Sequence, residues 1–474
     1  MSKKIKVRKN IIFPLIILFL FICFITVLNS SNLKNKLMDN ISVKDFETIN
    51  SSDRILILAP HPDDEAISSS GIIQKALSVG AKVKIVYLTN GEYNQEAYLI
   101  YEKKPLILKN QFMNLGKIRM SEALNAALIL GLEKSDLIFL GYPDFGTMDI
   151  FSEYWDKNKP YSNILERISN VPYSECKSPD APYIGQSILS DIEDILKDFK
   201  PSKIIVSSPV DANRDHQALY LFLRVALWDL KQEIGSPQFY SYLVHAKNWP
   251  IQKGMNIKST LDIPAAIQGF GEDWINSYLS AKETENKSNV ISQYVSQIRY
   301  NPPFLASFVR KNELFAVFKD IEINRSNEFY INGSNTDKTG KSDVNIQAIT
   351  EGKNLSKVSF KLEGDFLTIR LGLKRRIDQA FGISIYLMGY NNTRNFSEMP
   401  KIHIDLDIKG MSIKDKFTVV EKKDFSYYYQ GNDMILKIPL VAIGNPDFIL
   451  SHIKTHSGDI TLDDTAWRVL EIKY

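Results

Sequence analysis

Hydrophobic and polar positions follow two different rhythms along the chain, and the change falls near residue 300. Before it, short apolar runs rich in isoleucine, leucine and valine end in turn residues and alternate with segments of helical periodicity. The apolar runs are residues 54–59, 82–88, 136–140 and 203–206, and the helical segments are residues 65–79, 114–130, 185–199 and 216–230. This alternation predicts βαβ units and an α/β fold with an open, mostly parallel, Rossmann-like sheet.

After residue 301 the apolar residues alternate with polar ones in short stretches separated by Gly, Asn and Asp. These stretches are residues 358–362, 366–371, 402–408, 434–438 and 467–472. The pattern predicts a C-terminal antiparallel β-sandwich domain. Residues 145–183 interrupt the first rhythm with a tryptophan, several tyrosines and four prolines. They predict a long insertion over one face of the sheet, with a floppy loop as the alternative.

The N-terminal residues form a third pattern. Residues 3–9 are mostly basic and residues 11–28 are an almost unbroken apolar run. About 18 residues at about 1.5 Å each span ~27 Å, close to the hydrocarbon core of a bilayer. Because basic flanks stay in the cytoplasm, we expect a cytoplasmic tail (1–10), a single transmembrane helix (11–28) and an extracytoplasmic stalk (29–52). The alternative is a cleaved signal peptide and a secreted protein, although no Ala-x-Ala-like site follows.

Length and composition narrow the remaining possibilities. A chain of 474 residues exceeds what one core usually holds, so we expect two folded domains, residues 53–305 and 320–474. With 44% hydrophobic and 24% charged residues, wholesale disorder is excluded. A net charge of +3 gives no sign of a nucleic-acid partner, and Cys23 and Cys176 cannot build a disulfide framework. No feature indicates an obligate protein partner.

Candidate chemistry lies in two loops that directly follow predicted strands. Residues 59–65 read Ala-Pro-His-Pro-Asp-Asp-Glu, and residues 211–216 read Asp-Ala-Asn-Arg-Asp-His. Open α/β sheets bind ligands beyond the carboxyl ends of their strands, so both loops are well placed. Two histidines and a carboxylate with an open fourth position are typical of catalytic zinc, which lowers the pKa of a bound water toward about 7. The adjacent Asp63 and Asp64 can supply a general base and a ligand; the alternative is a polar turn with a helix cap.

The first loop resembles the Pro-His-Pro-Asp-Asp-Glu signature of the LmbE-like, or PIG-L, family of metal-dependent N-deacetylases. Three further segments resemble the family in the same order within about residues 53–250: Ile118–Ala123 with Leu130-Gly131, Phe139–Asp144, and Asp215–Ala218. The resemblance implies hydrolysis of the acetamide of an N-acetylated amino sugar, giving acetate and a free amine. With the predicted export, the substrate would be a cell-surface or envelope glycan.

The resemblance also implies roles for particular residues. Carried over position by position, the zinc ligands are His61, Asp64 and His216, the general base is Asp63, and the residues that hold sugar hydroxyls are Arg119 and Asp144. Iron or cobalt can occupy such a ligand set as well as zinc.

One position departs from the family. Asn213 stands where many members have a histidine that assists at the oxyanion. An Asn amide can still donate a hydrogen bond, and Arg214 could instead supply the positive charge. Asp215 could orient a ligand imidazole, and we interpret His245 as structural rather than functional. Two alternatives stay open: an inactive surface carbohydrate-binding protein and an amidase acting on a non-sugar amide. The C-terminal domain would grip a polymer or act as a spacer.

Overall fold

The computed structural model describes residues 43–103, 109–163, 167–264, 267, 272–333, 345–349, 352–378 and 381–474. By its contacts the chain divides after Lys44, and Asp45–Tyr474 forms one compact unit. The predicted basic tail and membrane anchor, and most of the predicted stalk, lie outside the described residues. In the described part of the chain, no helix is long and apolar enough to cross a bilayer.

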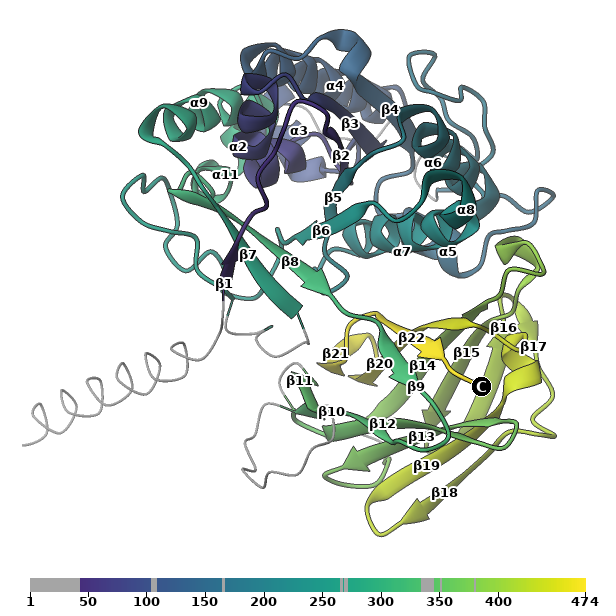
Figure 1. The fold of residues 1–474 in the computed structure, drawn as a ribbon. Helices are drawn as coiled ribbons and strands as arrows, with labels where there is room; N and C mark the ends of the chain where they lie inside the picture. Colours follow the sequence, from purple (N-terminus) through teal and green to yellow (C-terminus); the bar gives the residue numbers. More distant parts are fainter. Residues whose placement is uncertain are drawn as a thin grey trace, which may run out of the picture. The chain divides into compact units, whose positions relative to one another are not determined.

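A mixed sheet forms the core of the first part of this unit (Figure 1). After β1 (Val43–Asp45), the strand order is β7-β8-β6-β5-β2-β3-β4. Strands β6, β5, β2, β3 and β4 run parallel to one another, whereas β8 is antiparallel to both β6 and β7. Their bounds are β2 (Arg54–Ala59), β3 (Lys82–Thr89), β4 (Leu137–Tyr142), β5 (Lys203–Ser207), β6 (Gln238–Tyr242), β7 (Glu272–Tyr278) and β8 (Asn312–Phe318). The four strands that the apolar runs predicted are all present.

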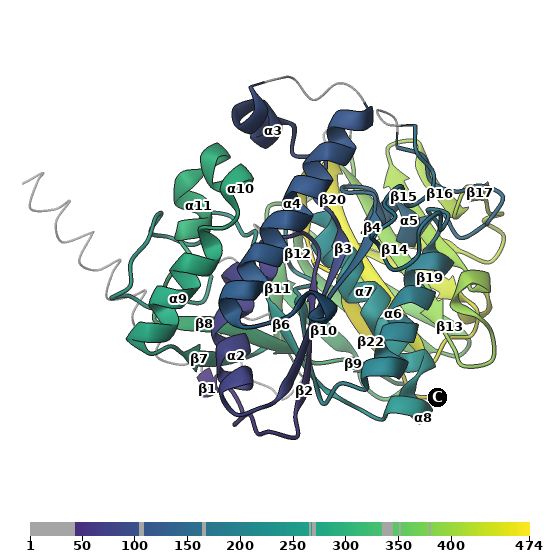
Figure 2. The same ribbon diagram turned by 90° about the horizontal axis from the view of Figure 1, so that it is seen from above.

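Helices cover both faces of this sheet (Figure 2). Helices α2, α4 and α9 pack together on one side, and α5, α6 and α7 on the other. The bounds are α2 (Asp64–Ser78), α3 (Gln95–Glu102), α4 (Lys109–Leu130), α5 (Thr147–Ser152), α6 (Gly185–Phe199), α7 (Arg214–Asp229), α8 (Lys231–Ile234), α9 (Ala281–Ile291), α10 (Val295–Tyr300) and α11 (Pro302–Ala306), with a 3₁₀ turn η1 (Lys134–Asp136). Helix α6 matches its predicted range because its apolar residues recur at helical spacing and all face the core.

Two further sheets make up the C-terminal part. One has the order β11-β10-β12-β13-β19-β18, and the other has the order β17-β16-β15-β14-β20-β22-β9, with β21 paired to β20. Their bounds are β9 (Ile321–Ile323), β10 (Phe329–Gly333), β11 (Asn345–Ile349), β12 (Leu355–Glu363), β13 (Phe366–Leu373), β14 (Gly382–Tyr390), β15 (Lys401–Asp407), β16 (Gly410–Asp415), β17 (Thr418–Val419), β18 (Ser426–Gln430), β19 (Asp433–Pro439), β20 (Phe448–Ser457), β21 (Ile460–Asp464) and β22 (Arg468–Ile472), with 3₁₀ turns η3 (Phe396–Glu398) and η4 (Leu440–Ile443). Alternate residues of the central strands are buried, as the period-two pattern predicted.

The C-terminal strands depart from the prediction in two respects. The β10–β11 and β22–β9 pairs are parallel, so the sheets are not purely antiparallel. Strand β8 lies beyond residue 305, the predicted end of the first domain, and yet pairs within the first sheet. The chain joins the C-terminal sheets only at β9. Because the contacts keep Asp45–Tyr474 together, the predicted division into two domains stays a prediction.

The predicted insertion, residues 145–183, begins with the short helix α5 and then continues without regular structure in its described residues. Backbone hydrogen bonds tie its two arms together, from Val171 N to Ala181 O (2.9 Å) and from Tyr183 N to Ser169 O (2.8 Å). The rings of Tyr173 and Tyr183 are almost fully buried. The described part of the insertion therefore packs onto the fold and is not the floppy loop of the alternative interpretation.

Candidate metal centre

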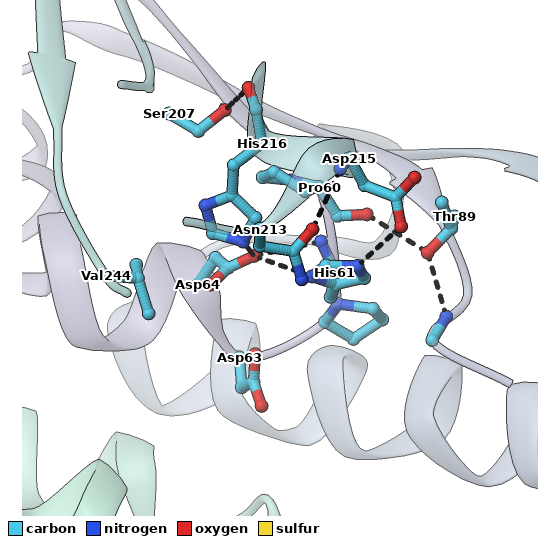
Figure 3. A network of polar contacts seen from close by, with 12 residues as sticks. Pro60, His61, Asp63, Asp64, Thr89, Ser207, Asn213, Asp215, His216 and Val244 are labelled. Atoms are coloured by element: carbon cyan, nitrogen blue, oxygen red, sulfur yellow. Dashed lines mark hydrogen bonds and ion pairs between the residues drawn. The ribbon is translucent and has the colours of Figure 1, made fainter. Parts of the chain in front are cut away.

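The two polar loops meet because β2 and β5 are parallel neighbours whose carboxyl ends lie at the same edge of the sheet. His61 follows the end of β2, and Asp64 opens helix α2 directly behind it. His216 lies in the first turn of α7, after β5. In Figure 3, His61, Asp64 and His216 lie close together, each reaching the site from a different turn of backbone.

Three donor atoms converge at this edge. His61 Nδ1 lies 3.3 Å from Asp64 Oδ2, and His216 Nε2 lies 3.2 Å from the same oxygen. One donor atom from each of the three residues lies within 4.8 Å of the other two. All three side chains are buried. A buried set of two imidazoles and one carboxylate at these separations has the composition of a divalent metal site.

Two neighbouring carboxylates are less suited to bind a metal because donors already occupy them. Asp215 accepts hydrogen bonds from the backbone of Phe145 and Thr147, and Asp211 accepts them from the backbone of Asn213 and Val244. Asp64 Oδ2, by comparison, accepts one backbone hydrogen bond, from His61 N at 3.0 Å.

The occupied carboxylates instead orient the imidazoles. Asp211 Oδ2 lies 3.3 Å from His216 Nδ1, and Asp215 Oδ2 lies 3.4 Å from His61 Nε2. Each histidine therefore has a carboxylate on one ring nitrogen and turns the other nitrogen toward Asp64. This is the usual arrangement of metal-ligating histidines.

The residues present fit a metal on a direct structural test. Neither ring nitrogen of His216 makes a well-aligned hydrogen bond, although the ring is fully buried. Buried polar atoms are rarely left without a partner in folded proteins. A cation between His61, Asp64 and His216 would give His216 Nε2 the partner that the protein alone does not provide.

The electrostatics of the three residues agree with this fit. Burial would raise the pKa of Asp64, but the imidazoles of His216 and His61 hold it well below its usual value. Burial opposes charge on His216, yet Asp211 and Asp64 raise its pKa to about 9. The site therefore favours positive charge at the positions of these imidazole protons, and a bound cation would supply that charge in their place.

Asp63 stands beside the three donors without capping helix α2. It occupies the N-cap position, but its side chain makes no capping hydrogen bond. The alternative of a simple polar turn and cap is therefore wrong for Asp63. Its φ of 132° is rare for a residue with a side chain. Burial raises the pKa of Asp63 to about 6, against the opposing charge of Arg119.

Arg119 braces the first loop. Its guanidinium donates to Gly91 O (2.9 Å) and Pro62 O (2.7 Å) and lies 3.2 Å from Asp63 Oδ2. Gly91 must be a glycine, because its φ is 65° and a Cβ there would lie 2.0 Å from Arg119 Nη1. The resemblance implied that Arg119 holds sugar hydroxyls; in the structure two of its nitrogens bind protein oxygens.

A cavity of about 580 Å³ opens over these residues. Asp144 and Asn213 line it together with the two loops, as the sequence predicted. Asp144 Oδ1 lies 3.2 Å from His61 Nε2 and makes no well-aligned hydrogen bond. Asn213 caps helix α7, with its Oδ1 accepting from Asp215 N at 2.8 Å, so its amide oxygen is used while the amide nitrogen keeps its donors.

Sequence reasoning missed several members of the site. Asp211 belongs to the second loop, and its position directly before the Asn-Arg-Asp-His run was the available signal. His245, interpreted as structural, lines the cavity and places Nδ1 3.1 Å from Asp211 Oδ1. Tyr300 and Phe304, from α10 and α11, form another wall of the cavity, and no local motif marks them.

Comparison with known families confirms the resemblance for part of the chain. Residues 56–227 match the family model PIG-L, described as GlcNAc-PI de-N-acetylase. This segment is a PIG-L domain, and it contains both loops of the candidate metal centre. The C-terminal sheets lie outside the match.

Solved structures with a similar fold include three examples. The first is N,N'-diacetylchitobiose deacetylase from Pyrococcus horikoshii (18% identity, 57% of this chain and 87% of that one, TM-score 0.35). The others are a teicoplanin deacetylase (14%, 56% and 99%, 0.34) and 4-carboxy-2-hydroxymuconate hydratase from Pseudomonas putida (15%, 58% and 98%, 0.36). At these identities and TM-scores the likenesses say nothing about the reaction. Among curated proteins no match was found.

Proposed function

We propose that this protein hydrolyses the acetamide of an N-acetylated amino sugar, releasing acetate and a free amine. The observation that carries the proposal is the convergence of His61, Asp64 and His216 beside Asp63, inside a PIG-L domain and at the floor of a cavity. Zinc is the default metal for such a ligand set, and other divalent metals can occupy it.

When bound, zinc polarises the amide carbonyl and activates a water molecule. The chain supplies the proton transfers. Asp63 lines the cavity next to Asp64 and has no capping duty, so its carboxylate takes a proton from the attacking water and passes it to the departing amine. Asp211 and Asp215 hold the imidazoles of His216 and His61 in orientation throughout.

Negative charge develops on the amide oxygen and needs a hydrogen-bond donor. We assign this role to the Asn213 amide nitrogen, since the capping hydrogen bond fixes the amide group at the cavity wall. Asp144 Oδ1 is placed to accept from a sugar hydroxyl. We assign Arg119 to positioning Asp63, because it links that carboxylate to Pro62 and Gly91.

We also propose that the catalytic part is exported and held at the membrane by residues 11–28. This rests on the basic and apolar patterns of the N-terminal sequence alone. Protease added to intact cells should degrade the protein. Complete protection, with full degradation after lysis, would contradict export.

The experiment that tests the reaction separates metal binding from proton transfer. Acetate release from an N-acetylglucosamine substrate and zinc content are measured for the full chain, Asp63→Asn and His216→Ala. We expect Asp63→Asn to keep its zinc and to lose about 10²- to 10⁴-fold in rate. His216→Ala should lose both zinc and activity.

The matched control is Asp194→Asn, which changes an exposed carboxylate and should leave both readouts unchanged. Asp63→Asn with unaltered activity, or His216→Ala with full zinc and activity, would sink the mechanism. Sugar binding without acetate release by the unaltered, zinc-loaded protein would favour the inactive binding protein instead.

A further inference from the structure

A row of four partly exposed aromatic side chains leads away from the candidate metal centre. We call Phe145, Tyr161, Tyr154 and Phe417 the aromatic row. A Cβ at Gly146 would lie 2.7 Å from the Tyr161 ring, so this ring packs against the residue next to Phe145. The centroids of Tyr161 and Tyr154 are 5.3 Å apart, and those of Tyr154 and Phe417 are 4.9 Å apart. The row is therefore continuous.

The two ends of the aromatic row connect two parts of the fold. Phe145 lines the cavity over the metal centre, and its backbone N–H donates to Asp215 at 2.7 Å. Phe417 lies between β16 and β17 of a C-terminal sheet. Phe145 is 56% exposed and Phe417 is 50% exposed. Large apolar side chains left half in water at both ends of a continuous row indicate a surface that binds something.

Hydrogen-bonding groups flank the aromatic row. The exposed side chains of Arg214 and Asp149 pair at 2.6 Å beside it. Glu153, on the residue before Tyr154, interacts electrostatically with Asp149, Arg214 and also with Lys414 of β16. These are two acidic and two basic groups, so the flank carries no net charge.

This combination decides between classes of ligand. A nucleic acid or another polyanion would require a basic surplus, which the balanced flank lacks. A protein partner would require a broad apolar patch with a polar rim, whereas the rings here follow a narrow line. Sugar residues present an apolar face that packs on aromatic rings and a rim of hydroxyls that bind charged and polar groups. Ring spacings near 5 Å suit successive residues of an extended glycan.

We propose that the aromatic row binds a glycan chain whose N-acetylated residue lies in the cavity, so that the substrate is a polymer and the C-terminal sheets grip it. This inference rests on the proposed deacetylase function. It assigns the C-terminal part a role in substrate binding in place of a spacer, because Phe417 is the one member of the row that this part contributes. Short substrates fill the cavity alone and do not reach Phe417.

The test uses N-acetylglucosamine oligomers of two and six residues with the full chain. For Phe417→Ala we expect the KM for the hexamer to rise about tenfold, with the kcat/KM for the dimer unchanged. Phe417→Trp should restore the hexamer KM. Tyr428→Ala is the matched control, because Tyr428 is an aromatic residue 48% exposed on strand β18 of the other C-terminal sheet.

Binding of the same oligomers to the Asp63→Asn variant, measured by calorimetry, separates this inference from the proposed reaction. If no substrate releases acetate but the hexamer still binds about tenfold tighter than the dimer, and only while Phe417 is present, the reaction fails and the glycan row stands. Equal affinity of the unaltered row for both oligomers, or no loss of hexamer binding on Phe417→Ala in a protein with unchanged melting temperature, would overturn the row.

Discussion

Asp63 shows how the chain accepts a local cost for a functional position. A φ of 132° at a non-glycine residue costs on the order of 1–3 kcal/mol. The conformation is held by hydrogen bonds from Ala66 N and Ile67 N to Asp63 O, both at 3.1 Å. Its result is that the side chain leaves the capping position and lines the cavity beside Asp64. A polar turn built only for stability would have kept the cap.

Asp211 offers the sharpest prediction for a single residue. It is fully buried, and the imidazoles of His216 and His245 hold its pKa well below the usual value although burial acts against this. Asp211→Asn removes the negative charge opposite His216 Nδ1 and should lower zinc affinity about 10- to 100-fold. Competition with a zinc chelator measures this.

The control for Asp211→Asn is again Asp194→Asn on the surface of α6, which should bind zinc as the unaltered chain does. Unchanged zinc affinity in Asp211→Asn would show that His216 needs no carboxylate to orient it.

Helix α2 carries the metal centre at its first turn and is interrupted further along. Glu313 of β8 accepts hydrogen bonds from Gly71 N (2.8 Å) and Ile72 N (3.1 Å), in the middle of the helix. Gly71 leaves room for this carboxylate, since a Cβ there would lie 2.0 Å from Leu279 Cδ2 and 3.0 Å from Glu313 Oε2. Lys287 of α9 completes the cluster, with Nζ 2.8 Å from Glu313 Oε1. The antiparallel strand β8 thus anchors the helix that presents Asp64.

Removing Lys287 should therefore destabilise the fold. Lys287→Met leaves Glu313 as a buried charge without its cation, which we expect to lower the free energy of unfolding by about 3 kcal/mol. Urea denaturation measures the change. Lys319→Met is the matched control, because that lysine is 63% exposed in its pair with Asp273 and surface pairs contribute little. Equal effects of the two substitutions would show that the buried pair gives no stability.

At the scale of the whole unit, the first sheet and the C-terminal sheets are joined by direct contacts. Trp228 of α7 stacks on Phe448 of β20 with centroids 4.7 Å apart, and Phe151 of α5 lies 5.6 Å from Phe396. The Tyr390 hydroxyl donates to Asp229 Oδ1 at 2.9 Å. These contacts account for the single compact unit from Asp45 onward.

This joint should make stability depend on pH. Burial and the neighbouring carboxyl of Asp229 raise the pKa of Glu193 to about 7, from an ordinary value of 4.5. The folded state therefore holds a proton that the unfolded chain releases earlier. The stability that this proton contributes is present below about pH 4.5 and is lost as the pH rises through about 7.

Glu193→Gln, which stays neutral, should melt about 2 °C higher than the unaltered chain at pH 8 and show a smaller difference at pH 5. Asp198→Asn, an exposed change on the same helix, should show no such pH dependence. An equal difference between Glu193→Gln and the unaltered chain at both pH values would contradict this account.

Much of the first sheet and its helices could be predicted because burial writes a period into the sequence. Strand β2 and helix α6 lie within one residue of their expected ranges. Strands β7 and β8 escaped prediction, since their pairing depends on segments far away in the chain and not on a local period. The same holds for the wall of the cavity formed by Tyr300 and Phe304.

By itself the sequence determined the alternation of strands and helices, the two loops at strand ends, and the residue types His61, Asp63, Asp64 and His216 that give those loops their chemistry. These are local properties, set by periodicity and by which side chains can bind a metal or carry a proton. Only the tertiary structure decided which carboxylate faces which imidazole, that Asp63 caps nothing, and that Phe417 continues a row from the cavity. Those relations join residues tens to hundreds of positions apart, and packing alone brings them together.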